Sequence, residues 1–340
     1  MITDSTTKRF RQVYIEITNK CNLTCSFCPR TRRPPADMDA ALFARIADEV
    51  KPLTDKVYFH VMGEPMMHPD FTDFIQICAD KALPVAITTN GTMLNTDFTK
   101  ALLEPIVRRV NFSLDALQPI ELDGKDNDKL GQILDFTELA FKQRADLYIY
   151  YRLWNLTSHA DGLDSDSNRK ICRRIEDAFG ITIPSHGYSS GRKSRQLLNR
   201  LYLHMDTRFT WPGEGESNLH NANGFCHALS SHFAILVDGT VVPCCLDHNG
   251  VTALGNCREQ SLNSILETPR ASAMIAGFEE RRLIEPLCQE CTFISRFAAS
   301  AKKRELMTVS PKNTFLPHPH PNPPLEREGI RESPLLQGED

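Results

Sequence analysis

Three cysteines lie close together near the start of the chain, at Cys21, Cys25 and Cys28. A loop of eight residues can fold back on itself, so these three thiolates can wrap one inorganic centre. Three ligands are one fewer than a closed tetrahedral zinc site or a fully ligated iron–sulfur cluster requires. The group therefore predicts an inorganic centre that is incompletely ligated. Zinc with a distant fourth ligand and three incidental buried thiols are the alternatives.

A second set of cysteines lies in the last third of the sequence, at Cys226, Cys244, Cys245, Cys288 and Cys291. A cysteine pair on a hairpin followed by Cys-x2-Cys is also typical of a zinc ribbon, and this segment alone favours zinc. The total of eleven cysteines is odd, which argues against a simple disulfide framework. The cysteines therefore indicate metal ligation or redox chemistry.

The composition is that of an ordinary globular chain: 340 residues, 24% charged, 41% hydrophobic, with a net charge of -4. These values exclude a wholly disordered chain. No apolar run approaches the roughly 18 residues that a membrane span needs. The slightly acidic balance gives no general reason to expect nucleic-acid binding. The first residues lack the apolar core of a secretion signal, so we expect a cytoplasmic protein.

Strands and helices must position these cysteines, and their periodicities alternate over the first 180 residues. We expect strands at 13–18, 56–61, 84–89, 109–114 and 147–154, and helices at 39–50, 70–81, from about 96, and 129–145. Repeated strand–helix units imply a parallel sheet covered by crossover helices. The predicted fold class is α/β with a barrel-like sheet, whose chemistry lies in the loops after the strands.

The pattern weakens after this first part. Residues 185–225 are polar and predict loops, apart from 201–206, a possible sixth strand. Asp238-Gly239 predicts a hairpin over 233–244. Helical spacing continues over 262–278, with a break near Pro269.

These segments suggest three parts of the chain. We predict a core over 1–215, a small cysteine-rich hairpin and helix domain over 216–305, and a disordered Pro-rich tail over 306–340.

The Cys-x3-Cys-x2-Cys motif, with Phe27 before its last cysteine, resembles the signature of the radical S-adenosylmethionine (SAM) superfamily. The resemblance extends over about residues 12–160. It implies a partial (β/α)6 TIM-like barrel in which Cys21, Cys25 and Cys28 bind a 4Fe–4S cluster with one open iron. It also implies that SAM chelates this iron and is reductively cleaved to a 5′-deoxyadenosyl radical, which abstracts hydrogen from a substrate.

The residues after the second strand, Gly63, Glu64 and Pro65, are similar to the family's Gly-Gly-Glu-Pro motif, which engages the amino group of SAM. Glycine permits close approach of the backbone, and a carboxylate suits an ammonium group. Met62 stands where the family has its first glycine. Without the preceding cysteines, this segment would predict only a turn.

Other strand ends also match the family. The resemblance places Asn90 near the sugar of SAM and Ser113 near its carboxylate, while Arg152 and Asn155 are candidates for the carboxylate or the sugar. A tight turn at Asn90, and a solvated strand end at Arg152 and Asn155, are the alternatives.

The second cysteine set resembles the SPASM/twitch extension of radical SAM enzymes, which carries auxiliary iron–sulfur clusters. No cysteine follows Cys291, so the sequence resembles the shorter twitch form, with one auxiliary 4Fe–4S cluster. The resemblance implies four ligands for this cluster: Cys226, Cys244, Cys288 and Cys291. Cys245 could replace Cys244, but consecutive strand residues point to opposite faces, so only one of the two should reach the cluster.

The sequence therefore predicts a radical SAM enzyme with two 4Fe–4S clusters that oxidises or modifies a peptide or a small molecule. The expected partners are this substrate and a flavodoxin- or ferredoxin-type electron donor, with no membrane and no nucleic acid. The acid or base of the reaction is not identified. The alternative is a non-catalytic iron–sulfur or zinc protein that serves as a redox sensor or scaffold.

Overall fold

The computed structural model describes residues 9–29, 31–117, 122, 127–159, 163, 165–189, 193–214 and 221–297. The strands are β1 (Gln12–Ile15), β2 (Val57–Tyr58), β3 (Val85–Thr89), β4 (Val107–Ser113), β5 (Tyr148–Leu156), β6 (Ser194–Leu198), β7 (Leu201–Thr207), β8 (His232–Ile235), β9 (Thr240–Val242) and β10 (Gly255–Asn256). The helices are α1 (Ala40–Val50), α2 (Phe71–Asp80), α3 (Thr96–Leu102), α4 (Lys129–Gln143), α5 (Asp166–Phe179), α6 (Leu262–Leu266), α7 (Pro269–Glu279) and α8 (Pro286–Gln289).

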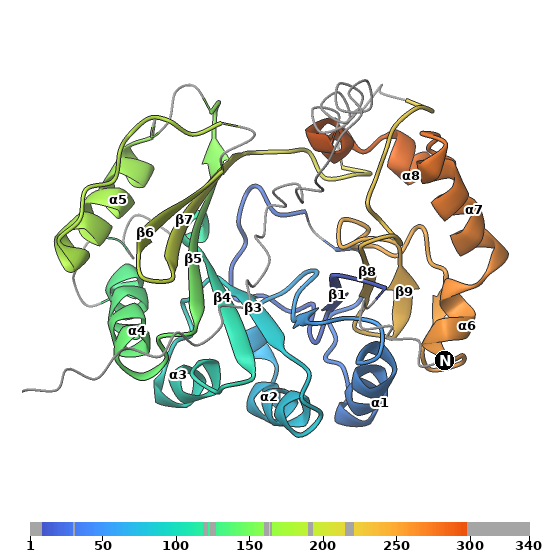
Figure 1. Ribbon diagram of the computed structural model, residues 1–340, viewed down its shortest axis with the longest axis horizontal. Helices are drawn as coiled ribbons and strands as arrows, with labels where there is room; N and C mark the ends of the chain where they lie inside the picture. The colour runs from blue at the N-terminus through green and yellow to red at the C-terminus, as the bar shows by residue number, and fades with distance from the viewer. Residues whose placement is uncertain are drawn as a thin grey trace, which may run out of the picture.

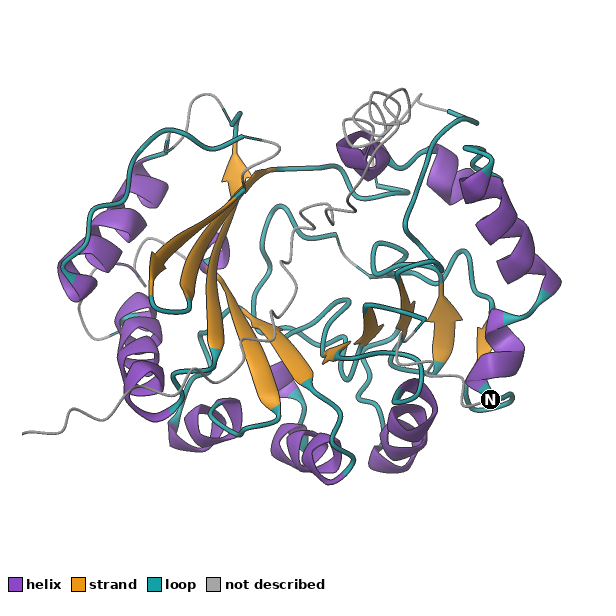
Figure 2. Ribbon diagram, in the orientation of Figure 1, coloured by secondary structure: helices purple, strands orange, loops and turns teal. Residues whose placement is uncertain are grey.

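The strands form one curved sheet in the order β10-β9-β8-β1-β2-β3-β4-β5-β7-β6. From β8 through β1 to β5 and on to β7, neighbouring strands are parallel. Helices α1 to α5 cover the outer face of this sheet, while its concave face looks inward (Figures 1 and 2). The predicted partial (β/α)6 barrel is confirmed, with β7 as its sixth strand, and the sheet does not close.

The helices begin where the sequence supplies caps. Asp39 accepts a hydrogen bond from the Leu42 amide at the start of α1, at 2.8 Å. Asn95 does the same for Phe98 in α3, at 2.9 Å. Such caps satisfy backbone donors that have no partner within the helix.

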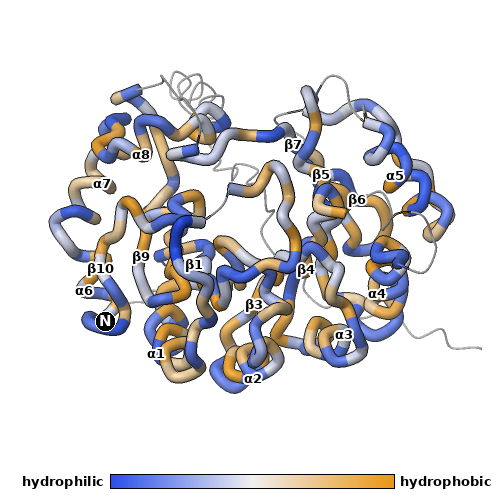
Figure 3. The backbone as a smooth tube through the Cα atoms, turned by 180° about the vertical axis from the view of Figure 1, so that it is seen from behind, coloured by the Kyte–Doolittle hydropathy of each residue, from blue (hydrophilic) through white to orange (hydrophobic). Residues whose placement is uncertain are grey.

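The helices on the outer face of the sheet each bury a narrow stripe of side chains along one side. In α5 the buried positions are Asn168, Ile171, Cys172 and Ile175, which share one face at helical spacing. The rest of α5 is largely hydrophilic (Figure 3). Between α1 and α2, Phe43 stacks on Phe74 with ring centroids 4.3 Å apart, so these two helices share an aromatic core against the sheet.

The second cysteine-rich part is built on the same sheet. The predicted hairpin is formed by β8 and β9, with Gly239 in its turn at a φ of +92°, a conformation that glycine adopts without strain. Strand β8 pairs with β1 in parallel, from Gln12 opposite His232 to Ile15 opposite Ile235. The predicted break at Pro269 is also present, since this proline opens α7 after α6 ends.

Some expectations differ from the structure. Residues 194–198 form β6, an antiparallel edge strand beside β7, within a stretch that we expected to be loops. Its sequence, Ser-Arg-Gln-Leu-Leu, lacks the β-branched alternation that would have revealed it. Strand β2 is shorter than predicted.

The predicted tail at 306–340 lies outside the described residues, and the predicted domain boundaries stay predictions. None of the helices in the described ranges has the length and apolarity to cross a bilayer.

Candidate active site

A cavity of about 1000 Å³ lies on the concave side of the sheet, among the loops that follow the parallel strands. All seven cysteines predicted as metal ligands line it: Cys21, Cys25, Cys28, Cys226, Cys244, Cys288 and Cys291. The pairing of β8 with β1 explains how cysteines from distant parts of the chain reach one space. This is the position in which parallel barrels carry their chemistry.

The first cysteine group lies on the loop after β1. A backbone hydrogen bond from Cys28 to the Cys25 carbonyl, at 3.1 Å, turns the loop back on itself. Desolvation of the thiol within the loop, together with the nearby thiols of Cys25 and Cys21, raises the pKa of Cys28 to about 12. Three thiolates this close repel one another, and a cationic centre removes that penalty. The donor set therefore fits an iron–sulfur cluster.

Asn90 fixes this loop from β3. Its side-chain amide donates to Asn22 Oδ1 at 2.9 Å, and its oxygen accepts from the backbone and hydroxyl of Thr92, at 2.9 and 2.7 Å. Asn22 in turn donates to the Thr92 hydroxyl at 2.8 Å. Asn90 lines the cavity, and its polar atoms position the cysteine loop. Its place near the sugar of SAM stays a prediction.

Glu64 is a buried carboxylate at the cavity wall, 2% exposed. It accepts hydrogen bonds from the Thr89 hydroxyl and from the backbone amide of Asn90, both at 2.7 Å. Burial raises its pKa to about 7, and these hydrogen bonds oppose the rise. A carboxylate held in this way can accept a hydrogen bond from an ammonium group.

Gly63 has a positive φ, a backbone conformation that residues with a Cβ atom rarely adopt. At its φ of +77°, a Cβ atom would lie 2.5 Å from the Thr18 carbonyl oxygen and 2.7 Å from that of Lys20. Only glycine therefore lets this turn pack against the cysteine loop. Met62, which departs from the family pattern, is buried beside β8 and β9 with Leu236 and Val242.

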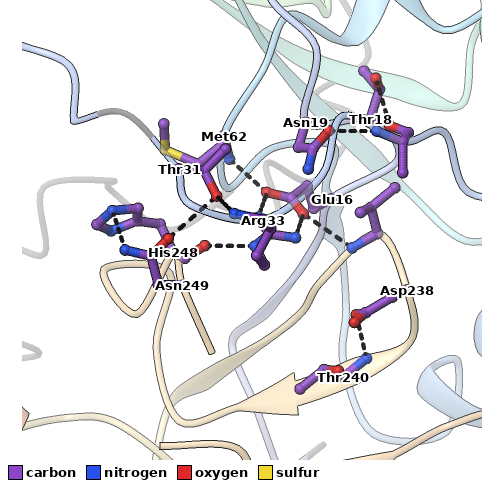
Figure 4. A network of polar contacts seen from close by, with 12 residues as sticks. Glu16, Thr18, Asn19, Thr31, Arg33, Met62, Asp238, Thr240, His248 and Asn249 are labelled. Carbon is purple, nitrogen blue, oxygen red and sulfur yellow. Dashed lines mark hydrogen bonds and ion pairs between the residues drawn. The ribbon is translucent and has the colours of Figure 1, made fainter. Parts of the chain in front are cut away.

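A charged pair that the sequence analysis missed joins both halves of the site (Figure 4). Glu16, which is fully buried, accepts two hydrogen bonds from the Arg33 guanidinium, both at 2.7 Å. Its oxygens also accept from the backbone amides of Met62, at 3.0 Å, and Val237, at 2.9 Å. Arg33 donates further to the His248 carbonyl at 2.7 Å. One carboxylate thus ties the cysteine loop, the Gly63 turn and the hairpin together.

The second cysteine group lines the other part of the cavity wall. Burial and, to a lesser degree, neighbouring cysteines raise the pKa of Cys226 to about 12 and that of Cys244 well above its usual value. Cys226 and Cys288 act on Cys244, and Cys245 acts on both Cys244 and Cys226. Cys245 also lines the cavity, and its thiol hydrogen-bonds Tyr14 of β1. Cys244 as the ligand, in place of Cys245, therefore stays a prediction.

The described residues contain no group of three or more His, Cys, Asp or Glu side chains arranged for a single metal ion.

The structure separates the remaining predicted ligands. Gly63, Ser113 and Arg152 line the cavity, whereas Pro65 and Asn155 do not. Pro65 opens a short 3-10 turn after Glu64. Asn155 exchanges two hydrogen bonds of 2.9 Å with Asn168 of α5, which uses its amide within the fold.

Two family models match the chain. Residues 15–149 match the radical SAM superfamily. Residues 226–292 match SPASM, an iron–sulfur cluster-binding domain. The chain therefore carries a radical SAM domain followed by a SPASM domain. These two domains indicate SAM binding and 4Fe–4S clusters, and their positions coincide with the two cysteine groups.

A curated relative from Pyrococcus furiosus, a tungsten-containing aldehyde ferredoxin oxidoreductase cofactor-modifying protein, is 37% identical over 111 residues, or 32% of this chain and 31% of its own. The chain spans less than half of the length of the first curated relatives it matches.

Two solved structures share the radical SAM fold. BtrN in complex with AdoMet and 2-DOIA is 19% identical, with a TM-score of 0.54 over 84% of this chain and 94% of BtrN. SuiB of Streptococcus suis bound to S-adenosylmethionine is 17% identical, with a TM-score of 0.54 over 84% of this chain and 72% of SuiB.

Four further polar or aromatic side chains on the inner face of the barrel were not expected from the sequence. Tyr58, Trp154 and His204 come from strands and His60 follows β2, and all four line the cavity and alternate with apolar residues. The alternation of Tyr150, Arg152 and Trp154 with apolar residues could have predicted this inner face, because every second residue of a strand faces the same side.

Proposed function

We propose that this protein reductively cleaves SAM and uses the resulting radical to oxidise a small substrate held in the cavity. The observation that carries the proposal is the convergence of Cys21, Cys25, Cys28 and the buried Glu64 on one cavity, whose wall also holds a second cysteine group. When bound, a 4Fe–4S cluster together with SAM supplies a 5′-deoxyadenosyl radical. The chain's own residues hold and orient these groups.

The first cysteine loop leaves room for SAM. Cys21, Cys25 and Cys28 would hold a 4Fe–4S cluster through three thiolates, and the amino and carboxylate groups of SAM would complete its set of ligands. Glu64 accepts a hydrogen bond from the SAM ammonium, and Gly63 lets the backbone approach it. Ser113, at the end of β4, contacts the SAM carboxylate.

The second cysteine group holds one auxiliary 4Fe–4S cluster, through Cys226, Cys244, Cys288 and Cys291. Four thiolates leave no open position, so this site transfers electrons and does not bind substrate directly. Its place on the wall of the same cavity supports acceptance of an electron from the substrate radical, for a net two-electron oxidation. Relay of electrons to the first cluster is its other possible role.

The substrate is a small molecule or a peptide side chain that enters the cavity. BtrN, of which the chain matches 94%, was solved with 2-DOIA. SuiB, of which it matches 72%, was also solved with its precursor peptide SuiA. We further propose a cytoplasmic protein that receives electrons from a flavodoxin- or ferredoxin-type donor.

Anaerobic reconstitution with iron and sulfide tests the proposal. With a strong reductant, we expect release of 5′-deoxyadenosine from SAM and about eight irons per chain, with little zinc. Cys25→Ala should abolish the release, whereas Cys78→Ala, a buried thiol of α2 outside the cavity, should retain it. A wild-type protein that binds iron yet releases no 5′-deoxyadenosine would instead be a non-catalytic redox sensor or scaffold. About one zinc per chain would reassign the second site.

A further inference from the structure

Inward-facing residues of β5 and β7, together with Tyr58 and His60 at the end of β2, form the deep part of the cavity. We call Tyr58, His60, Arg152, Trp154 and His204 the polar floor, and all five line the cavity. Six side-chain polar atoms in the described residues are buried without a hydrogen-bond partner, and four of them belong to this floor. These four are the Tyr58 hydroxyl, His60 Nδ1, Trp154 Nε1 and His204 Nε2.

Burial of such atoms without partners destabilises a fold. Tyr58 and His204 are each only 2% exposed, so bulk water does not reach them freely. A cluster of four such atoms on one surface is therefore a feature that a bound ligand would explain.

The floor is held in a fixed geometry. The Arg152 guanidinium carbon lies 3.6 Å from the centre of the Trp154 ring. The rings of Trp154 and His204 are nearly perpendicular, with centroids 5.4 Å apart. Arg152 and His204 are register partners across β5 and β7. On the other side, Tyr58 and His60 meet edge to face at 5.6 Å.

The floor is also positively charged. After burial itself, four cations lower the pKa of His204 far below its usual value: Arg152, Arg109, Lys193 and Arg296. Lys193 and Arg296 are both paired with Asp206, so their charges are partly matched.

Among the residues that the structure describes, neither Arg109 nor Arg152 forms such an ion pair. Arg109 stacks on Tyr150 at 3.5 Å and donates to the amide oxygen of Asn111, at 2.9 Å. Arg152 makes no hydrogen bond and no ion pair with other residues that the structure describes. Burial lowers the pKa of Arg152 to about 10, and Asp115 is the carboxylate that opposes this shift. One carboxylate balances only one of the two cations. A net positive charge remains at the floor.

We infer that the polar floor binds an anionic, oxygen-rich group of the substrate, a carboxylate or a phosphate. The donors are a guanidinium, an indole N–H, a hydroxyl and two imidazoles, which suits a ligand rich in acceptor oxygens. This inference rests on the proposed function and names the class of its substrate. It also assigns Arg152 to the substrate, whereas the family resemblance made it a candidate for SAM.

Binding to the iron-loaded protein with SAM present tests the inference. The probes are inorganic phosphate, succinate and, as a neutral polyol, myo-inositol, followed by calorimetry. We expect phosphate or succinate to bind and myo-inositol not to bind. The anion with the higher affinity identifies the anionic group of the substrate as a phosphate or a carboxylate. Tyr58→Phe and Trp154→Phe each remove one donor but keep a ring, and should weaken anion binding about tenfold. Arg152→Gln should abolish it.

A second readout separates ligand recognition from a structural role. Without a probe, Tyr58→Phe should raise Tm by about 2 °C, because it removes a buried hydroxyl that has no partner. Tyr151→Phe is the matched control, since that hydroxyl is buried but bonded to Thr137 at 2.6 Å. It should lower Tm and leave anion binding unchanged.

Several results would overturn the inference: no binding of either anion, equal binding of myo-inositol, or a loss of SAM affinity in Arg152→Gln equal to its loss of anion affinity. A protein that cleaves SAM but binds neither anion would refute the inference and leave the proposed function intact. A protein that binds an anion at the floor but cleaves no SAM would refute the proposed function and leave anion binding at the floor intact.

Discussion

The two cysteine sites lie on one cavity but are built in different ways. The first comes from a single loop, Cys21 to Cys28, in which Cys21 and Cys28 are exposed. The second combines three separate segments, around Cys226, Cys244 and Cys288, and its thiols are less exposed. The first can therefore form locally after β1, whereas the second requires that the hairpin and α8 are already in place.

This difference has an energetic consequence. A bound centre that joins distant segments closes long loops, and the entropy that it removes from the unfolded chain grows with loop length. The first centre closes only one short loop. The auxiliary centre should therefore stabilise its region more, while the first centre serves chemistry and adds little stability.

The largest expected effect separates the two sites. Cys288→Ala should lower the iron content from about eight to about four per chain, yet retain SAM cleavage in the absence of substrate, because the loop after β1 keeps its ligands. It should also expose residues 221–297 to limited proteolysis. Iron analysis, 5′-deoxyadenosine release and peptide mapping measure these changes.

Cys257→Ala is the control for Cys288→Ala, since Cys257 is a buried thiol that does not line the cavity. An unchanged iron content in Cys288→Ala, or simultaneous loss of SAM cleavage, would contradict the separation of the two sites.

The next effect concerns the residue that couples the sites. Glu16→Ala would leave the Arg33 guanidinium, only 13% exposed, without its partner, and would also release the amides of Met62 and Val237. Breaking a buried pair in this way costs about 3–5 kcal/mol of unfolding free energy. Urea unfolding measures the loss.

The double variant Glu16→Gln with Arg33→Met tests the cause of this loss. Because it leaves no buried charge, we expect it to be more stable than Glu16→Ala. Equal or lower stability of the double variant would show that backbone contacts, and not the charge pair, hold the two regions together.

The contrast between the sites also marks what the sequence could predict. The first loop, the parallel strands and the hairpin at Asp238-Gly239 depend on short spacings, and these are readable from the sequence. The pairing of β8 with β1 and the Glu16–Arg33 bond are non-local, so no local pattern indicates them.

Asn155 shows the same limit at a single residue. Its place near the end of a strand makes it a candidate for the carboxylate or the sugar of SAM, with a solvated strand end as the alternative. In the structure its amide is used by Asn168 of α5. Which face a strand-end residue presents depends on register and on the helix packed behind it, and neither is encoded within a few residues.

The smallest expected effect tests how the second region holds its ligands. Arg270 of α7 donates two hydrogen bonds of 2.8 Å to Glu285, the residue before the helix that carries Cys288. These bonds hold the pKa of Glu285 below its usual value, and burial opposes them. A lowered folded pKa gives stability that is present above the unfolded value of about 4.3 and is lost as the pH falls through the folded value.

Glu285→Gln should therefore cost about 0.5–1 kcal/mol at pH 7, because Arg270 is 43% exposed and water screens the pair. The difference from wild type should vanish near pH 3, as protonation removes the charge of the native carboxylate. Urea unfolding of the iron-free chain at both pH values measures this, so that acid release of iron plays no part. Glu280→Gln, which breaks an exposed pair with Arg282, should change neither value. A cost of Glu285→Gln that stays the same at both pH values would assign the effect to packing, and not to the charge pair between Arg270 and Glu285.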